Sequence, residues 1–313
     1  MLKVDFINVG DGDAILLRRG ENDDTYTVLV DCGRPYVEFA EGSEKRSCIT
    51  YLMDEGVTRI DLLVLTHLHL DHIGGALAVL RNIPVARLVA LRLPPKNSRW
   101  IHLPRREVKT VVGMCDVLNL WRDTVDFADD LGVICQEIQK GGSLELGDLR
   151  LRFLLPDPDL IERQRSVFQS LYLGETPPED EMFRVSKERN CSSLIIRAEY
   201  AGRSVLLTGD AYASCLENLE FLPCDILKVP HHGDSKSMTE KLIQSLRPSF
   251  AVISCQNNPT QKKDRPCEDV MALLQRHVPN ILCTENKELP SYPAATRDAA
   301  RFVVKEDGTI ISP

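Results

Sequence analysis

The sequence predicts an α/β protein of four layers, in which two β-sheets pack face to face and helices cover the outer faces. Apolar runs with strand character alternate with segments of helical spacing, and this alternation occurs twice along the chain. Polar runs that contain histidine follow two predicted strands, where layered α/β folds collect their ligands. We expect a single domain over residues 1–313, with an N-terminal half of about 1–155 and a C-terminal half of about 190–313.

The first half alternates strands and helices. Apolar runs predict strands at residues 4–9, 14–18, 26–31, 60–65, 88–91 and 149–155. Helical spacing predicts helices near residues 49–53 and 73–80 and a long one over 108–131. Residues 156–189 are polar and contain proline, so we expect an irregular insertion or lid there.

The second half repeats the pattern. Strands are predicted at residues 193–200, 203–208, 225–229, 250–254, 301–304 and 309–311, and helices near 212–219 and 270–277. A short turn at residues 201–202 joins the first two of these strands. Two β-rich halves with helices imply sheets inside and helices outside.

The run Thr66–His72, T-H-L-H-L-D-H, is a metal-binding sequence. It places three of the chain's seven histidines directly after an apolar strand. Alternate side chains of an extended chain share a face, so His67 and His69 are expected to bind one ion. The turn behind them brings Asp71 and His72 toward a second ion, and the two glycines that follow let the next helix begin close by.

The charge of the chain is uneven. A net charge of −8 excludes a protein that coats nucleic acid in general, because phosphate contacts need clustered cations. Residues 81–110 nevertheless contain eight basic side chains and one acid. We call this segment the basic flap and expect its Arg105 and Arg106 to contact substrate phosphates, with a solvated loop as the alternative. Trp100 in the flap either stacks a base or covers the edge of the core.

The ten cysteines occur singly, without any C-x-x-C pair, which indicates reduced thiols. The N-terminus lacks the layout of a signal peptide, and no apolar run has the length of a membrane helix. We therefore expect a cytoplasmic location and no membrane partner. Phosphate-loop and dinucleotide fingerprints are also absent from the sequence.

Four further motifs join the metal-binding run: L-T-G-D at 207–210, V-P-H-H-G at 229–233, F-I-N-V-G-D-G-D-A at 6–14 and V-L-V-D-C-G at 28–33. Together they resemble the metallo-β-lactamase superfamily, and within it the soluble domain of ComEC-type competence proteins and their free-standing relatives. The resemblance implies the metallo-β-lactamase fold, two divalent ions (Zn²⁺ or Mn²⁺) and a phosphodiester substrate.

The resemblance also implies a set of ligands. His67 and His69 would bind the first ion, Asp210 would bridge both ions, and the second ion would take Asp71, His72 and His231. The two ions would hold a hydroxide that attacks the substrate, with Asp71 orienting it.

Other residues would assist. His232 is expected to face the substrate or leaving group rather than an ion, and Lys236 to contact phosphate as a further catalytic residue. Thr66, Asp31 and Asp13 are expected to orient the imidazoles, with structural turns as the alternative.

The chain departs from its relatives at three places. Between the metal-binding run and Asp210, the sequence has no histidine suited to complete the ligands of the first ion. Where that histidine would be expected, the sequence reads N-C-S-S from Asn190. A weaker ligand or a water fills the gap; softness favours Cys191 over Asn190 for zinc, although a buried thiol is the commoner state. Asp234 replaces a serine, and Arg265 replaces a histidine. Asn190 and Arg265 are kept as candidate substrate-binding residues.

The sequence thus predicts a metal-dependent phosphodiesterase or nuclease that acts on nucleic acid or nucleotides. A thioester or lactone hydrolase of the same fold is one alternative, and a non-enzymatic metal-binding regulatory module is another. A protein partner is left open, and the sequence does not indicate an oligomeric state.

Overall fold

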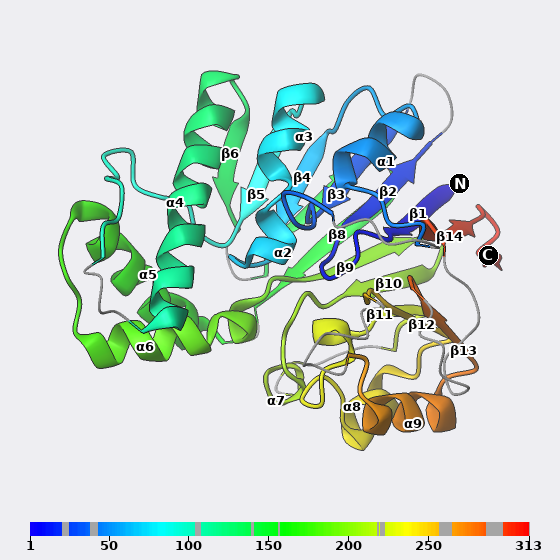
Figure 1. The fold of residues 1–313 in the computed structure, drawn as a ribbon. Helices are drawn as coiled ribbons and strands as arrows, with labels where there is room; N and C mark the ends of the chain where they lie inside the picture. Colours follow the sequence, from blue (N-terminus) through cyan, green and yellow to red (C-terminus); the bar gives the residue numbers. More distant parts are fainter. Residues whose placement is uncertain are drawn as a thin grey trace.

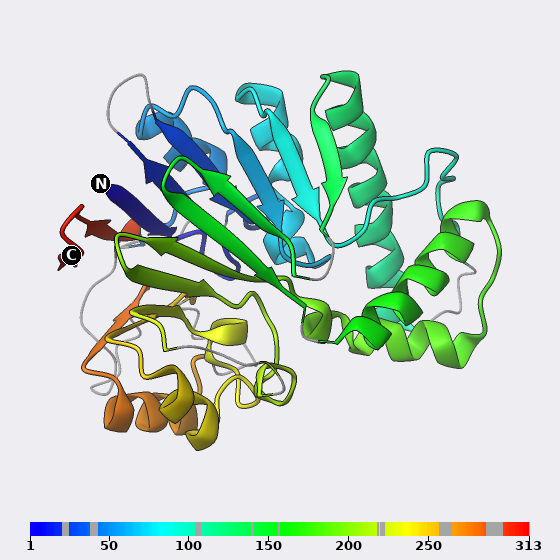
Figure 2. The ribbon, with the colours of Figure 1, turned by 180° about the vertical axis from the view of Figure 1, so that it is seen from behind.

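The computed structural model confirms the predicted four-layer arrangement, with two sheets packed face to face and helices outside (Figures 1 and 2). It describes residues 1–20, 25–37, 43–103, 108–138, 141–155, 157–217, 219, 223–256, 265–285 and 297–312. Among these residues, no helix has both the length and the apolar composition that crossing a membrane requires.

Within the described residues, the first sheet has eight strands in the order β15-β14-β1-β2-β3-β4-β5-β6. Their bounds are β1 Leu2–Ile7, β2 Ile15–Arg19, β3 Tyr26–Val30, β4 Leu62–Leu65, β5 Arg87–Ala90, β6 Ile134–Glu137, β14 Ala299–Val304 and β15 Ile310–Ile311. Strands β3 to β6 run parallel, whereas β14 pairs antiparallel with β1. The last two strands of the chain therefore belong to the sheet of the first half.

In the part of the chain that the structure describes, the second sheet has seven strands in the order β13-β12-β11-β10-β9-β8-β7. Their bounds are β7 Ser143–Leu146, β8 Leu149–Leu154, β9 Ile195–Tyr200, β10 Arg203–Leu207, β11 Ile226–Lys228, β12 Phe250–Ile253 and β13 Asn280–Cys283. Strand β8, which was expected in the first half, thus belongs to the second sheet. Between the sheets lies a continuous apolar core that includes Phe6, Phe153 and Phe302, all fully buried.

Helices cover the outer face of each sheet (Figure 1). Apolar side chains of α1 (Cys48–Asp54), α3 (Ala76–Asn82) and α4 (Lys109–Asp130) form a second apolar cluster on the first sheet, together with the short α2 (Leu70–Ile73). On the second sheet, α7 (Ala213–Leu216), α8 (Glu240–Leu246) and α9 (Glu268–His277) form a third. Two short 3₁₀ turns, η1 (Arg189–Ser192) and η2 (Pro230–Gly233), complete the elements.

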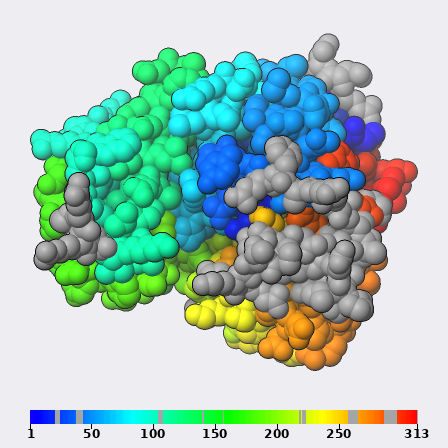
Figure 3. Space-filling view, viewed as in Figure 1, coloured from blue at the N-terminus to red at the C-terminus, as the bar shows by residue number. Residues whose placement is uncertain are grey.

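The expectation of an irregular insertion at residues 156–189 is wrong, because the segment contains two helices, α5 (Pro158–Leu173) and α6 (Glu179–Lys187). Asp157 caps α5 by accepting a hydrogen bond from the Leu160 backbone N–H at 2.9 Å, and Pro158 is tolerated in the first turn. Apolar side chains such as Phe168 and Val185 pack the pair against α4. The three helices form a lobe at the left of Figures 1 and 3. Its role as a lid stays a prediction.

Candidate metal centre

The candidate centre lies where strands of both sheets end. Strand β4 leads into the metal-binding run Thr66–His72, β10 leads into Asp210, and β11 leads into the turn Pro230–Gly233. Since β3 pairs parallel with β4 and β10 with β11, the carboxyl ends of each pair share one edge of their sheet. A Cβ at Gly12 would lie only 2.2 Å from the Asp71 backbone oxygen, so this glycine allows the first loop to approach the run.

Asp210 stands at the middle of the centre and is 1% exposed. Its Oδ2 lies 3.9 Å from Nε2 of His67, and its Oδ1 lies 3.3 Å from Nε2 of His72 and 3.4 Å from Nε2 of His232. Two groups of possible ligands share this carboxylate, namely His67, His69 and Asp210, and Asp71, His72, His232 and Asp210. One carboxylate oxygen thus faces each group, which is the geometry of a bridging ligand.

The two consecutive histidines are arranged differently from the expected assignment. His232, not His231, lies with Asp71 and His72; its Nε2 is 3.9 Å from Asp71 Oδ2. His231 Nε2 is 3.7 Å from Oδ2 of Asp210, on the side of the first group. Adjacent side chains diverge in extended backbone, whereas both of these residues are left-handed, with φ of 48° and 56°. His232 therefore lies at the place beside Asp71 and His72 at which His231 was expected.

The buried polar atoms of the centre fit divalent cations. His72 Nε2, His232 Nε2 and Asp210 Oδ1 are buried and have no hydrogen-bond partner in the described part of the chain. Burial alone would lower the pKa of His72, yet the carboxylates of Asp210 and Asp31 raise it well above its ordinary value. Burial alone would raise the pKa of Asp210, yet His232 and His72 hold it far below. A bound cation can take the place of the protons that the imidazoles of His72 and His232 direct at the carboxylate of Asp210.

Contacts behind the centre orient the imidazoles. His72 Nδ1 lies 2.7 Å from Oδ2 of Asp31, which also accepts a hydrogen bond from the Thr66 hydroxyl at 2.6 Å. His232 Nδ1 lies 2.9 Å from the backbone oxygen of Ser254. When Nδ1 of each ring donates to these oxygens, the lone pair of each Nε2 is available to a cation on the side of Asp210.

A lysine that the sequence analysis missed lies directly under the centre. The ammonium of Lys228, which is fully buried, pairs with Oδ2 of Asp13 and donates to the Gly209 backbone oxygen at 3.1 Å. Its Nζ is also 3.9 Å from Asp210 Oδ1. The available signal was a lysine at the end of an otherwise apolar strand, since a buried lysine requires a partner.

The candidate substrate-binding residues Asn190 and Arg265 both reach His231. The Asn190 amide nitrogen lies 3.0 Å, and the Arg265 Nη2 lies 2.6 Å, from His231 Nε2. Cys191, by contrast, hydrogen-bonds to Cys215 and is absent from both groups of possible ligands. Burial, aided by the cation of Arg265, lowers the pKa of His231 to about 4, so this imidazole is neutral.

Two further side chains lie at the rim. The ammonium of Lys236 lies 5.5 Å from the centre of the Tyr212 ring, and that ring packs on His231 at 5.4 Å between centroids. Arg34 was not singled out in the sequence; its Nη2 is 2.7 Å from Asp11 Oδ2 and 4.0 Å from Asp71 Oδ2. Arg34 thus places a guanidinium beside the second group.

The basic flap is described only in part. Arg105 and Arg106 lie outside the described residues, so their contact with substrate stays a prediction. Arg92 is 7% exposed and donates to Gln164 at 2.6 Å, so it is a core cation rather than a surface one. Trp100 is 47% exposed, and the Arg122 guanidinium lies 5.2 Å from its ring centroid.

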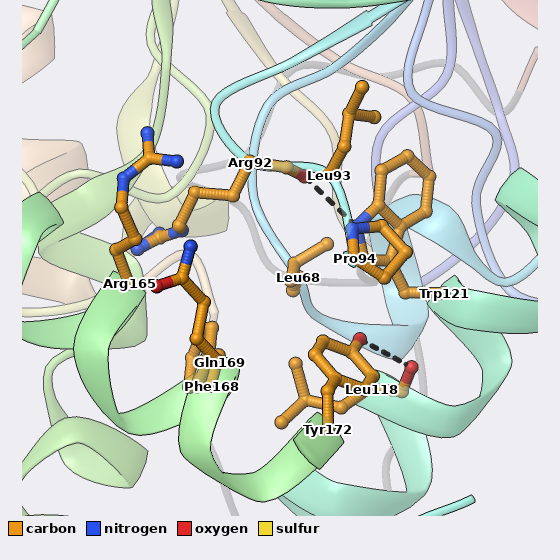
Figure 4. Close-up of a pocket in the computed structure, with 10 residues that line it drawn as sticks. All are labelled: Leu68, Arg92, Leu93, Pro94, Leu118, Trp121, Arg165, Phe168, Gln169 and Tyr172. Carbon is orange, nitrogen blue, oxygen red and sulfur yellow. Dashed lines mark hydrogen bonds between the residues drawn. The ribbon is translucent and has the colours of Figure 1, made fainter. Parts of the chain in front are cut away.

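A pocket lies between the metal-binding run and the helical lobe of α4, α5 and α6 (Figure 4). It is lined by Leu68, which separates the two first-group histidines in sequence, and by Trp121, Phe168 and Tyr172 from α4 and α5. Trp121 donates to the Arg92 backbone oxygen and Tyr172 to that of Leu118, as the dashed lines show. The polar atoms of both aromatic side chains are therefore satisfied within the protein.

The sequence and fold were compared with known proteins. The family model of the metallo-β-lactamase superfamily matches residues 7–256. ComE operon protein 3 of Bacillus subtilis (strain 168) is 28% identical over 309 residues, which cover 93% of this chain and 33% of that protein. Recombination protein 2 of Haemophilus influenzae is 24% identical over 259 residues, 80% of this chain and 24% of that protein.

The chain therefore spans about a third or less of the length of these curated relatives. Among solved structures, the metallo-β-lactamase fold protein YhfI of Bacillus subtilis matches with a TM-score of 0.47 and 12% identity, covering 90% of this chain and 96% of that one.

Proposed function

The chain belongs to the metallo-β-lactamase superfamily, whose members include metal-dependent hydrolases, and from this premise we propose that it is a phosphodiesterase that acts on nucleic acid or nucleotides. The observation that carries the proposal is the pair of ligand groups that share Asp210, with the guanidiniums of Arg34 and Arg265 beside them. A relative named for recombination also favours a nucleic-acid substrate.

The residues would divide between two ions as follows. His67, His69 and Asp210 would hold the first ion, and Asp71, His72, His232 and Asp210 the second. Zn²⁺ and Mn²⁺ both suit sites of imidazole and carboxylate. When bound, two such ions supply a water that is nucleophilic at neutral pH and positive charge that offsets charge on the phosphoryl oxygens.

The side chains around the ions would bind and orient the substrate. Asp71 is the least buried carboxylate of the two groups, with 16% of its side chain exposed, so it would accept a hydrogen bond from the attacking water. Arg34 forms an ion pair with Asp11, and Arg265 forms one with Asp234. A planar guanidinium can contact two oxygens of one phosphate, so these residues would orient a diester on the ions. Lys236 would add a rim contact.

The test is hydrolysis of a substrate panel by protein stripped of metal and reloaded with Zn²⁺ or Mn²⁺. The panel holds labelled single-stranded DNA, RNA, a chromogenic phosphodiester, a chromogenic thioester and a lactone. Asp210→Asn should abolish all turnover, whereas Asp148→Asn, which changes an exposed carboxylate paired with Arg19, should not. Cleavage of the phosphodiesters alone supports the proposal. Cleavage of only the thioester or the lactone would replace it with a small-molecule hydrolase.

A further inference from the structure

The first group offers fewer ligands than the second. Its members are two imidazoles and the shared Asp210, whereas the second has Asp71, His72 and His232 besides that carboxylate. Zinc sites in proteins usually have three or four protein ligands, and the superfamily histidine expected before Asp210 is absent from the sequence. The residues nearest this gap are His231 and Asn190, both 6% exposed.

The turn between β11 and α8 places one histidine on each side of Asp210. His231 and His232 both have left-handed backbone, with φ/ψ of 48°/42° and 56°/23°. Residues other than glycine rarely adopt this conformation. Consequently His232 Nε2 lies 3.4 Å from Oδ1 of Asp210, and His231 Nε2 lies 3.7 Å from Oδ2. The latter oxygen also faces His67, at 3.9 Å.

Nε2 of His231 is directed at this same region and accepts hydrogen bonds there. Its two neighbours are the Asn190 amide at 3.0 Å and the Arg265 Nη2 at 2.6 Å. The second amide atom of Asn190, Oδ1, is buried without a hydrogen-bond partner among the residues described. Rotation of the amide by 180° exchanges its oxygen and nitrogen, so Asn190 can present either a donor to His231 or an oxygen to a cation.

Arg265 blocks the same lone pair. A guanidinium carries no lone pair for a metal, so it cannot be a ligand, and its hydrogen bond uses the electrons that an ion would need. Asp234 fixes it there, with Oδ2 at 3.2 Å from Nη2 and 3.3 Å from Nε. Asp234 and Arg265 are 31 positions apart in the sequence, and the structure brings them into contact.

We propose that His231 is the third nitrogen ligand of the first ion, and that Arg265, anchored by Asp234, competes with this ion for Nε2 of His231. The inference rests on the proposed two-ion site and deepens it. The first ion is then bound more weakly than the second, and the Asp234–Arg265 pair determines the difference in affinity. Release of Arg265, for example onto a substrate phosphate, favours the ion.

Calorimetric titration of the metal-free protein with Zn²⁺ tests both parts. The wild type should bind two ions, one more weakly. His231→Gln should weaken the weaker site by about tenfold or more and leave the tighter site unchanged, whereas Arg265→Met should tighten the weaker site by about tenfold. Arg276→Met, which removes an exposed arginine of α9, is the matched control and should change neither site. Cobalt absorption provides a second readout, because loss of a nitrogen ligand shifts the visible bands.

Each part has its own contradicting result. Unchanged binding of both ions by a folded His231→Gln protein would remove His231 from the ligands, and unchanged binding by Arg265→Met would remove the competition. If His231→Gln does not fold, Arg265→Met decides through both readouts. A tighter weaker site with shifted cobalt bands shows a freed nitrogen ligand, whereas a tighter site with unchanged bands shows only the loss of a positive charge and would overturn the competition. A wild type that binds fewer than two ions would instead contradict the two-ion proposal itself.

Discussion

Asp31 Oδ2 lies 2.7 Å from Nδ1 of His72, and both residues are buried. The same carboxylate accepts hydrogen bonds from the Thr66 hydroxyl at 2.6 Å and, through Oδ1, from the Thr66 backbone N–H at 2.8 Å. Asp31 therefore ties the imidazole to the loop that carries the first two histidines. A carboxylate behind a ligating imidazole fixes the ring and raises its basicity.

Asp31→Asn should therefore weaken the second ion. The amide keeps the size of the side chain but removes the negative charge that supports His72, and we expect affinity to fall by about 10- to 100-fold. Competition with a chelator of known affinity measures the change. Equal affinity in the wild type and variant would show that the contact only holds the loop.

Asp71→Ala should abolish turnover while the fold persists. The side chain faces the second group, whereas the structural contact at this residue is made by its backbone oxygen, which accepts from the Asp13 N–H at 3.2 Å and is kept in alanine. Turnover of a chromogenic phosphodiester and the circular dichroism spectrum should be recorded together. Undiminished turnover with a native spectrum would refute the role of Asp71.

Lys228→Met should strongly destabilise the metal-free protein. It leaves the buried carboxylate of Asp13 without its cation, and removing one partner of such a pair costs about 3–5 kcal/mol. The double variant Asp13→Asn, Lys228→Met removes both charges and should recover part of the loss. Urea unfolding gives both values. A double variant no more stable than Lys228→Met would show that the charge of Asp13 is not the cause.

Asp298 predicts a pH dependence of stability. Hydrogen bonds from Arg301, at 2.8 and 2.9 Å, hold the pKa of Asp298 below its ordinary value. A lowered folded-state pKa stabilises the protein above the unfolded pKa of about 4, and this stabilisation is lost as the pH falls through the folded value. Because both side chains are partly exposed, the effect should stay below about 1 kcal/mol. The difference in unfolding free energy between wild type and Asp298→Asn should shrink on acidification; a constant difference down to pH 2 would contradict the assignment.

Much of the fold is predictable where hydrophobic periodicity is strong. The helix expected at 108–131 is α4, Lys109–Asp130, because a buried stripe runs along its length. Strands β6 and β7, at the edges of the two sheets, were missed, since I-C-Q-E and S-L-E-L are short and half polar. Helices α5 and α6 were missed because the prolines and acidic residues that begin them read as loop signals.

The candidate metal centre was also predictable from the sequence only in part. The run Thr66–His72 was recognisable because strand, turn and helix stand together in the sequence. The division of His231 and His232 between the two sides of Asp210 was not, because left-handed backbone at two consecutive histidines has no propensity signal. The Asp234–Arg265 contact joins residues 31 positions apart, and only the fold shows that the two departures from the relatives are one feature.

Turnover measured against the number of Zn²⁺ or Mn²⁺ ions bound per chain shows whether two ions act together on a phosphodiester. Metal-free protein is reloaded stepwise, bound metal is counted by elemental analysis, and hydrolysis of a chromogenic phosphodiester is followed in the same samples. If they do, we expect little turnover up to one ion and a steep rise as the second binds, with none at any loading in Asp210→Ala. Full turnover at one ion, or turnover in metal-free protein, would contradict joint action of the two ions.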